Sequence, residues 1–184
     1  QCVDGRYRAE VVAKPVQEYA WDDGITHWIG VSANPTDFHG GAYTLIQVHA
    51  PNEPTGSTCD FAGNAFSLTP SLRGGEMYYE LDVILNGGRS TGTGAGSNQT
   101  LNVWSEPMVE NTWVDFVMGF TLSTQGKGYF YFFRNGQLVY SKTGVTNVNS
   151  KDSCGVVIPS GLRAHNGPHI GIYGPPCGSA AWET

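Results

Sequence analysis

Three short segments of this chain combine residue types that suit acid–base and anion-binding chemistry. They are centred on Arg8, on Gln47 with His49, and on Tyr173. Arginine and glutamine can neutralise a carboxylate by charge and hydrogen bonding. Histidine or tyrosine can remove a proton, and tyrosine can return one to a leaving oxygen. Together these groups suit β-elimination on a uronic acid polymer, because neutralising the C6 carboxylate makes the C5 proton removable.

Each of these residues lies on a segment that alternates like a β-strand. In 43–50, Gln47 and His49 alternate with apolar residues, so both polar side chains are expected on one face. The segments 5–14 and 169–173 show the same separation of apolar and reactive types. We therefore expect the four reactive residues to share one concave surface.

The rest of the chain predicts an all-β protein, because no segment has convincing helical periodicity. Asn135-Gly136 between two β-rich runs is typical of a two-residue type I′ hairpin, and we expect the aromatic residues of 129–133 in the core. Many short antiparallel strands indicate a single domain over residues 1–184, a β-jelly roll or concanavalin-like sandwich of two antiparallel sheets with a concave groove. Further strands are expected at 24–33, 76–85, 101–104 and 113–122.

Composition narrows the class of partner. The 184 residues suffice for a sizeable core, and no apolar run is long enough to span a membrane. The formal charge of −6 argues against nucleic acid and, unless positive charge is locally concentrated, mildly against polyanions. We expect a monomer that has no nucleic-acid or membrane partner.

The cysteines and one sequon suggest the compartment. Four cysteines without zinc-like spacing, low charge and the sequon at Asn98 fit a mature secreted protein with two disulfides. Of the three possible pairings we favour Cys2 with Cys59 and Cys154 with Cys177. We expect no metal cofactor, although loop carbonyls could still hold a structural calcium ion.

In this order, Arg8-Ala9-Glu10-Val11, Gln47-Val48-His49 and Gly171-Ile172-Tyr173 resemble the signatures of jelly-roll polysaccharide lyases. The pattern is most similar to alginate lyases of polysaccharide lyase family 7, and related glucuronan and heparin-type lyases share the fold. By position, the resemblance implies Arg8 and Gln47 as carboxylate neutralisers and His49 as base or neutraliser. It implies Tyr173 as the acid, with the role of base also open to it. The implied substrate is an acidic polysaccharide such as alginate or glucuronan, cleaved in endo fashion.

The chain departs from that pattern at positions that would contact the polymer. Val12 stands where the family has a second arginine, and His169 replaces a lysine. A groove with two cations fewer would bind a polyanion less tightly or bind a different one, so several uronate polymers stay open. The substrate-binding candidates are His169, Arg6, Tyr78 and Trp104, with core or rim packing as the alternative for the last two.

Two other classes of function stay open. Glu80 and Asp82 resemble the Glu-x-Asp-x-x-Glu motif of glycoside hydrolase family 16 β-glucanases, but Leu85 occupies the place of the third carboxylate. In a lyase these two acids would pair with Arg6 or Arg89 or lie outside the groove. A non-catalytic carbohydrate-binding module is the other alternative. His27 is the alternative base, on a different strand.

Overall fold

The computed structural model describes eight stretches of the chain, and for some strands we use the backbone pairing alone. The described residues are 2–3, 6–12, 24–36, 44–49, 64–87, 100–152, 154–157 and 168–176. Within them the secondary structure is β, as expected from the sequence. No helix among these residues has the length and apolarity needed to cross a membrane.

Eleven strands make up the described part of the fold. Each segment expected to be a strand contains one, with ends shifted by a few residues. The strands are β1 (Cys2–Val3), β2 (Arg6–Val12), β3 (His27–Ala33), β4 (Thr44–His49), β5 (Asn64–Arg73), β6 (Glu76–Ile84), β7 (Thr100–Pro107), β8 (Val114–Thr121), β9 (Gly128–Arg134), β10 (Gln137–Val145) and β11 (Pro168–Pro176).

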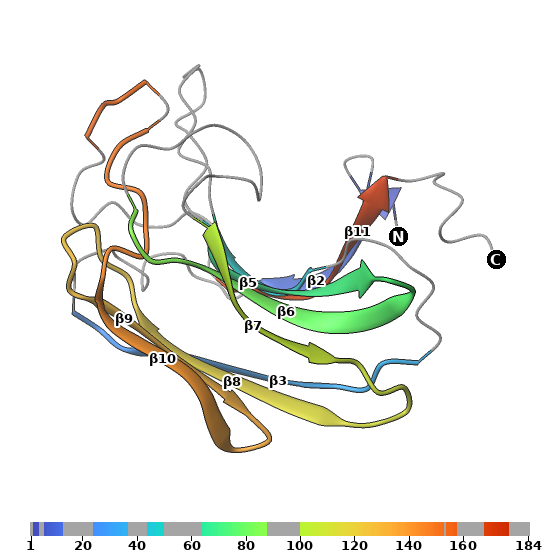
Figure 1. Cartoon of the computed structure of the whole chain (residues 1–184). Helices are drawn as coiled ribbons and strands as arrows, with labels where there is room; N and C mark the ends of the chain where they lie inside the picture. The colour runs from blue at the N-terminus through green and yellow to red at the C-terminus, as the bar shows by residue number, and fades with distance from the viewer. Residues whose placement is uncertain are drawn as a thin grey trace.

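These strands form two antiparallel sheets. The seven-stranded sheet has the order β1-β2-β11-β4-β5-β6-β7, and the four-stranded sheet has the order β10-β9-β8-β3. Figure 1 shows the two sheets as layers, with the larger sheet curving away from the smaller one towards β2 and β11. We call the side of each sheet that faces the other sheet its inner face and the opposite side its outer face. The expected jelly-roll sandwich is confirmed.

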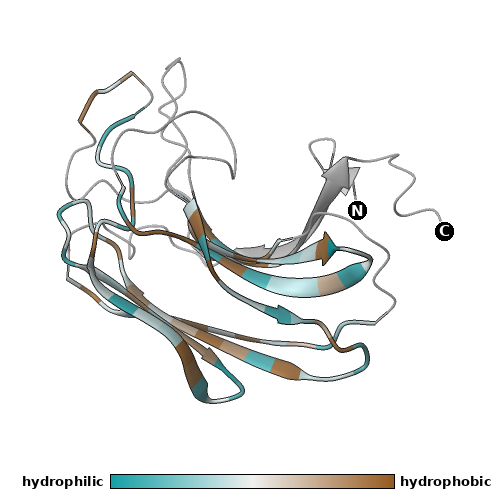
Figure 2. Cartoon of the chain, in the orientation of Figure 1, coloured by the Kyte–Doolittle hydropathy of each residue, from teal (hydrophilic) through white to brown (hydrophobic). Residues whose placement is uncertain are grey.

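The core lies between the inner faces and is rich in aromatic rings. Phe66 packs against Phe120 at 4.9 Å between ring centroids, and Tyr79 packs against Phe116 at the same distance, so each contact joins the two sheets. Alternation keeps apolar side chains on these inner faces, and Figure 2 shows hydrophobic and hydrophilic segments alternating along the strands.

Two turns and one proline shape the described strands. Asn135 and Gly136 have φ of 48° and 77° and join β9 to β10, so the predicted two-residue hairpin is confirmed. The strand β5 was not predicted, although its alternation is regular. It contains Pro70, which lies beyond Leu68, the last β5 residue that pairs with β4. Its missing N–H therefore costs no hydrogen bond to β4.

The burial of residues 129–133 differs in part from the prediction, and the disulfide pairing stays untested. The prediction that 129–133 is core is wrong in part, because Phe130 and Phe132 are buried but the alternate residues lie half-buried on the outer face. Cys154 is disulfide-bonded. The pairing of the four cysteines stays a prediction, since Cys59 and Cys177 lie outside the described residues.

Candidate active site on the seven-stranded sheet

The sheet brings together the three segments that carry the candidate residues, although they lie far apart in sequence. β11 is inserted between β2 and β4. Tyr173 is the direct backbone partner of Arg8 on β2, and His169 is the direct partner of Gln47 on β4. Directly paired residues of an antiparallel sheet lie about 5 Å apart and belong to the same face. The two members of each candidate pair, Arg8 with Tyr173 and Gln47 with His169, are thus direct neighbours in the sheet, and the two pairs are four positions, about 13 Å, apart along β11.

The same register separates His49 from Tyr173. Tyr173 pairs with Thr44, at one end of β4, whereas His49 occupies the other end. The separation of five positions corresponds to about 17 Å along a strand. His49 is instead two residues from Gln47, and Arg6 lies at the start of β2, paired with Pro176. The candidate site therefore has two parts, one near Arg8 and Tyr173 and one near Gln47, His49 and His169.

A polar row crosses the outer face from the second part of the site. Gln47 pairs with Ser67, Ser67 with Asp82, and Asp82 with Asn102. Gln47 and Ser67 are buried, and Asn102 donates a hydrogen bond of 3.1 Å from its Nδ2 to Asp82 Oδ1. Ser67 and Asn102 were not among the predicted site residues, although the alternation of β5 could have placed Ser67 on this face.

The acidic residues of β6 have different partners from those expected. Glu80 forms an ion pair with Arg73 on β5, rather than with Arg6 or Arg89, and its side chain is only 13% exposed. The guanidinium of Arg73 also lies 5.7 Å from the ring centroid of Tyr78, whose hydroxyl donates a 3.2 Å hydrogen bond to Glu76. The negative charge of Glu80 is thus compensated locally, which lowers the cost of this carboxylate near a polyanion.

Two of the aromatic candidates lie on the inner faces, away from the polar row. Trp104 packs edge-on against Phe132 at 5.0 Å and against Phe116 at 6.3 Å, so it contributes to the core rather than to a sugar platform. A bulge in the pairing of β6 with β7 puts Trp104 opposite Leu81 and Asn102 opposite Asp82. His27 belongs to the four-stranded sheet, with its ring 5.6 Å from Phe120, and is not a candidate base for this site.

The third carboxylate of the hydrolase motif has no counterpart at its position directly after β6. Leu85, at the position of the third acid, packs partly buried against the core. Asp82 is hydrogen-bonded to Asn102 and Glu80 is paired with Arg73. Retaining hydrolysis needs one carboxyl group free to act as proton donor. The partners of these two acids fit that role poorly.

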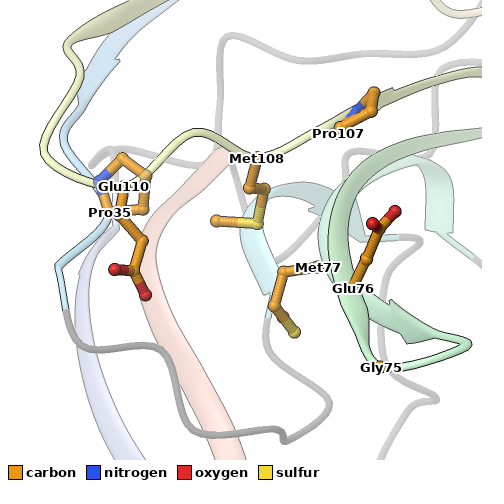
Figure 3. Close-up of a pocket in the computed structure, with 7 residues that line it drawn as sticks. All are labelled: Pro35, Gly75, Glu76, Met77, Pro107, Met108 and Glu110. Carbon is orange, nitrogen blue, oxygen red and sulfur yellow. The ribbon is translucent and has the colours of Figure 1, made fainter.

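A pocket of about 480 Å³ lies at the far end of β6 from the polar row. Figure 3 shows Met77 and Met108 between the carboxylates of Glu76 and Glu110. The backbone holds this pocket together, since Met108 N–H donates to the Met77 carbonyl at 2.8 Å. Two carboxylates beside thioethers would repel an anionic polymer, so this pocket is not a subsite for uronate.

Tyr79 lies on the inner face of the seven-stranded sheet, and its pKa is raised. Burial, followed by the nearby carboxylate of Glu106, raises the pKa of Tyr79 to about 12, and Arg134 acts in the opposite sense. Its hydroxyl is buried without a hydrogen-bond partner. Tyr79 is therefore neutral at physiological pH and structural. Among the described residues, no group of three or more histidine, cysteine or acidic side chains is placed to hold a metal ion.

The two-sheet fold, with the three motif strands adjoining in one sheet, places the chain in the class of all-β jelly-roll proteins. A family model described as polysaccharide lyase matches residues 1–183, so the chain belongs to the polysaccharide lyase family. The class inferred from the three motifs is confirmed.

A solved structure and the curated sequences complete the comparison. The crystal structure of endo-β-1,4-glucuronan lyase from the fungus Trichoderma reesei is similar, with a TM-score of 0.58 and 16% sequence identity. The match covers 93% of this chain and 64% of that one, so this chain spans about two thirds of the length of that protein. At this identity the likeness shows the fold. No curated protein sequence matches the chain.

Proposed function

We propose that the protein cleaves a uronic acid polymer by β-elimination at the outer face of the seven-stranded sheet. The observation that carries the proposal is the insertion of β11 between β2 and β4, with Tyr173 opposite Arg8 and His169 opposite Gln47. Two findings support it: the chain belongs to the polysaccharide lyase family, and its fold is similar to that of a glucuronan lyase.

The reaction needs a base, an acid and a cation or hydrogen-bond donor. The base takes the C5 proton, the electrons of that C–H bond form the C4=C5 double bond, and the C4–O4 bond breaks. The acid gives its proton to the leaving O4. Arg8 neutralises the C6 carboxylate, because its strand position is next to that of Tyr173.

Tyr173 serves as both base and acid in this proposal. A C5 proton and the neighbouring O4 are close enough for one side chain to reach both in turn, whereas His49 lies about 17 Å away along β4. Gln47, His49 and His169 bind the adjoining sugar residues instead. This division follows the two parts of the candidate site.

Glucuronan and alginate are the substrates that we propose to test first, and endo cleavage is part of the proposal. We further propose a secreted monomer that works without a metal cofactor. Tyr78 and Arg6 would contact the polymer at the edges of the site. Trp104 is left out because its ring packs against Phe132.

The test is the ultraviolet absorbance of the unsaturated uronate product. The protein is incubated separately with polymannuronate, polyguluronate, glucuronan and a neutral β-glucan. Rising absorbance on one acidic polymer, lost in Tyr173→Phe and kept in Tyr140→Phe, is the expected result. Tyr140 is a control on β10 of the other sheet. Flat absorbance with reducing sugar released from the neutral glucan would overturn the proposal in favour of hydrolysis.

A further inference from the structure

The outer face of the four-stranded sheet carries a group of aromatic and aliphatic side chains that no part of the lyase site uses. Trp28 is 58% exposed, Leu138 47% and Val117 36%, whereas the tyrosines and Phe133 are half-buried. The register places these residues side by side across four strands. We call this surface the aromatic platform, and it consists of Trp28, Val117, Tyr129, Tyr131, Phe133 and Leu138.

The ring of Trp28 lies flat on the sheet at the centre of the platform. Trp28 pairs with Gly119, and a Cβ atom added to Gly119 would meet the indole atoms Cη2 and Cζ3 at 2.6 Å. One face of the indole therefore rests on the glycine backbone and the other faces solvent. Phe133 holds the ring from the side, with 6.2 Å between centroids. Such a ring loses little conformational freedom on binding, because it is already fixed.

A polar rim adjoins the platform at the end of β3. A shallow hollow of about 380 Å³ there is lined in part by Gly30, Ser32 and Asp115. The Ser32 hydroxyl donates to Asp115 Oδ1 at 2.5 Å, and Asn135 Oδ1 accepts a hydrogen bond from the Asp115 backbone N–H at 2.8 Å. The carboxylate is thus held in place and can accept further hydrogen bonds from hydroxyl groups.

Size and charge decide which kind of occupant fits. A stable protein–protein interface takes about 20–30 residues from each partner, far more than the six residues of the platform. The only charged group described at the rim, Asp115, is an anion and would repel a polyanion or an anionic membrane surface. A flat ring beside fixed hydrogen-bond acceptors matches a sugar, which has an apolar C–H face and hydroxyls at its edge. We propose that the platform binds a neutral polysaccharide chain, separate from the lyase site on the opposite face of the molecule.

The experiment compares two hexasaccharides with the same β-1,4-linked backbone. Cellohexaose is neutral, and its counterpart made of glucuronate carries a carboxylate on each sugar. Binding of both is measured by isothermal titration calorimetry on the full chain carrying Tyr173→Phe, in which the anionic hexamer should bind without being cleaved, and the other variants are made in the same background. We expect Trp28→Ala to weaken cellohexaose binding about tenfold or more, the loss typical of truncating a central stacking tryptophan. Binding of the anionic hexamer should not change, so the platform and the lyase site are tested independently.

Three further variants separate stacking from misfolding and from general hydrophobicity. Trp28→Phe keeps a flat ring and should retain most of the affinity. Gly119→Ala should lift the indole and weaken binding while leaving Trp28 in the chain. Leu72→Ala removes an equally exposed apolar side chain, 56% exposed on β5, and should have no effect. Denaturant unfolding curves of each variant check that a loss of binding is not due to misfolding.

Several results would overturn the proposal. They are no binding of cellohexaose by the Tyr173→Phe protein, equal losses in Trp28→Ala and Leu72→Ala, or unchanged binding in Trp28→Ala. Light scattering, which measures the oligomeric state, could give a further contrary result. If the unmodified protein is a dimer and Trp28→Ala is a monomer, the platform is a contact between copies of this chain instead.

Discussion

Asp82 provides the sharpest test of where an anionic polymer lies. It belongs to the polar row and is separated from Gln47 by two strand spacings, about 10 Å. If the polymer crosses this row, the Asp82 carboxylate repels the uronate bound beside Gln47. The change Asp82→Asn removes that charge. The hydrogen bond from Asn102 can persist, because an asparagine oxygen accepts it as the carboxylate does.

The expected size of the effect follows from Coulomb's law. Two unit charges about 10 Å apart interact by about 0.4 kcal/mol in bulk water and by about 1.7 kcal/mol at an effective dielectric constant of about 20. Removing the repulsion should therefore lower KM by about twofold to about twentyfold. The effect should be largest at about 0.01 M salt, where the Debye length is about 30 Å, and should nearly vanish at 1 M salt.

The assay is the initial rate of absorbance increase against polymer concentration at both salt concentrations. Glu110→Gln is the matched control, because it changes the net charge from −6 by the same amount. Glu110 lines the pocket beside Met77, which is five residues, or about 17 Å, along β6 from Asp82. Equal changes of KM in the two variants, or an effect that survives 1 M salt, would refute the placement of the polymer on this row. Loss of hydrolysis of a neutral glucan in Asp82→Asn would instead support the hydrolase.

Three other changes have expected outcomes. His49→Ala should raise KM, whereas Tyr173→Phe should abolish kcat, because the register separates the two residues. If steady-state kinetics instead show that His49→Ala abolishes kcat, His49 is the base. Trp104→Ala should destabilise the fold by about 3–5 kcal/mol in denaturant unfolding, since its ring packs between the sheets. Tyr79→Phe removes a buried hydroxyl without a partner and should stabilise the fold by about 1 kcal/mol at neutral pH. The pKa of Tyr79 is about 12 when folded and about 10 when unfolded, so the unmodified protein should lose stability as pH rises from 10 to 12, and this part of the loss should be absent in the variant.

Local patterns predicted the strands, because alternation and turn chemistry depend on neighbouring residues. The hairpin at Asn135-Gly136 was predicted correctly, since few residue pairs adopt positive φ at both turn positions. β5 was not predicted, although Phe66, Leu68 and Leu72 alternate with polar residues. Its Pro70 is tolerated because pairing with β4 has already ended at Leu68.

The candidate site depended on features that no local pattern contains. Regular β-strand alternation would put Asn102 and Trp104 on the same face of β7. The bulge in the pairing of β7 with β6 puts them on opposite faces instead. The ion pair of Glu80 with Arg73 likewise needed a register that only the assembled sheet defines. The three motifs could be recognised because their residue types suit one reaction. The separation of Tyr173 from His49 could not, since it depends on the register of β11 against β4, which only the assembled sheet defines.

Because β11 carries part of the proposed active site, its position in the sheet would tie activity to a late step of assembly. Its pairs with β2 join residues about 160 positions apart, such as Arg8 and Tyr173, whereas β4 to β7 follow one another in sequence as neighbouring strands. Contacts at such separation pay a large loop-closure entropy before they are stabilising. The sheet from β4 to β7 and the four-stranded sheet can therefore form their shared core before the site exists. A destabilising change in β11 should then abolish turnover while the core that contains Phe116 and Phe132 stays folded.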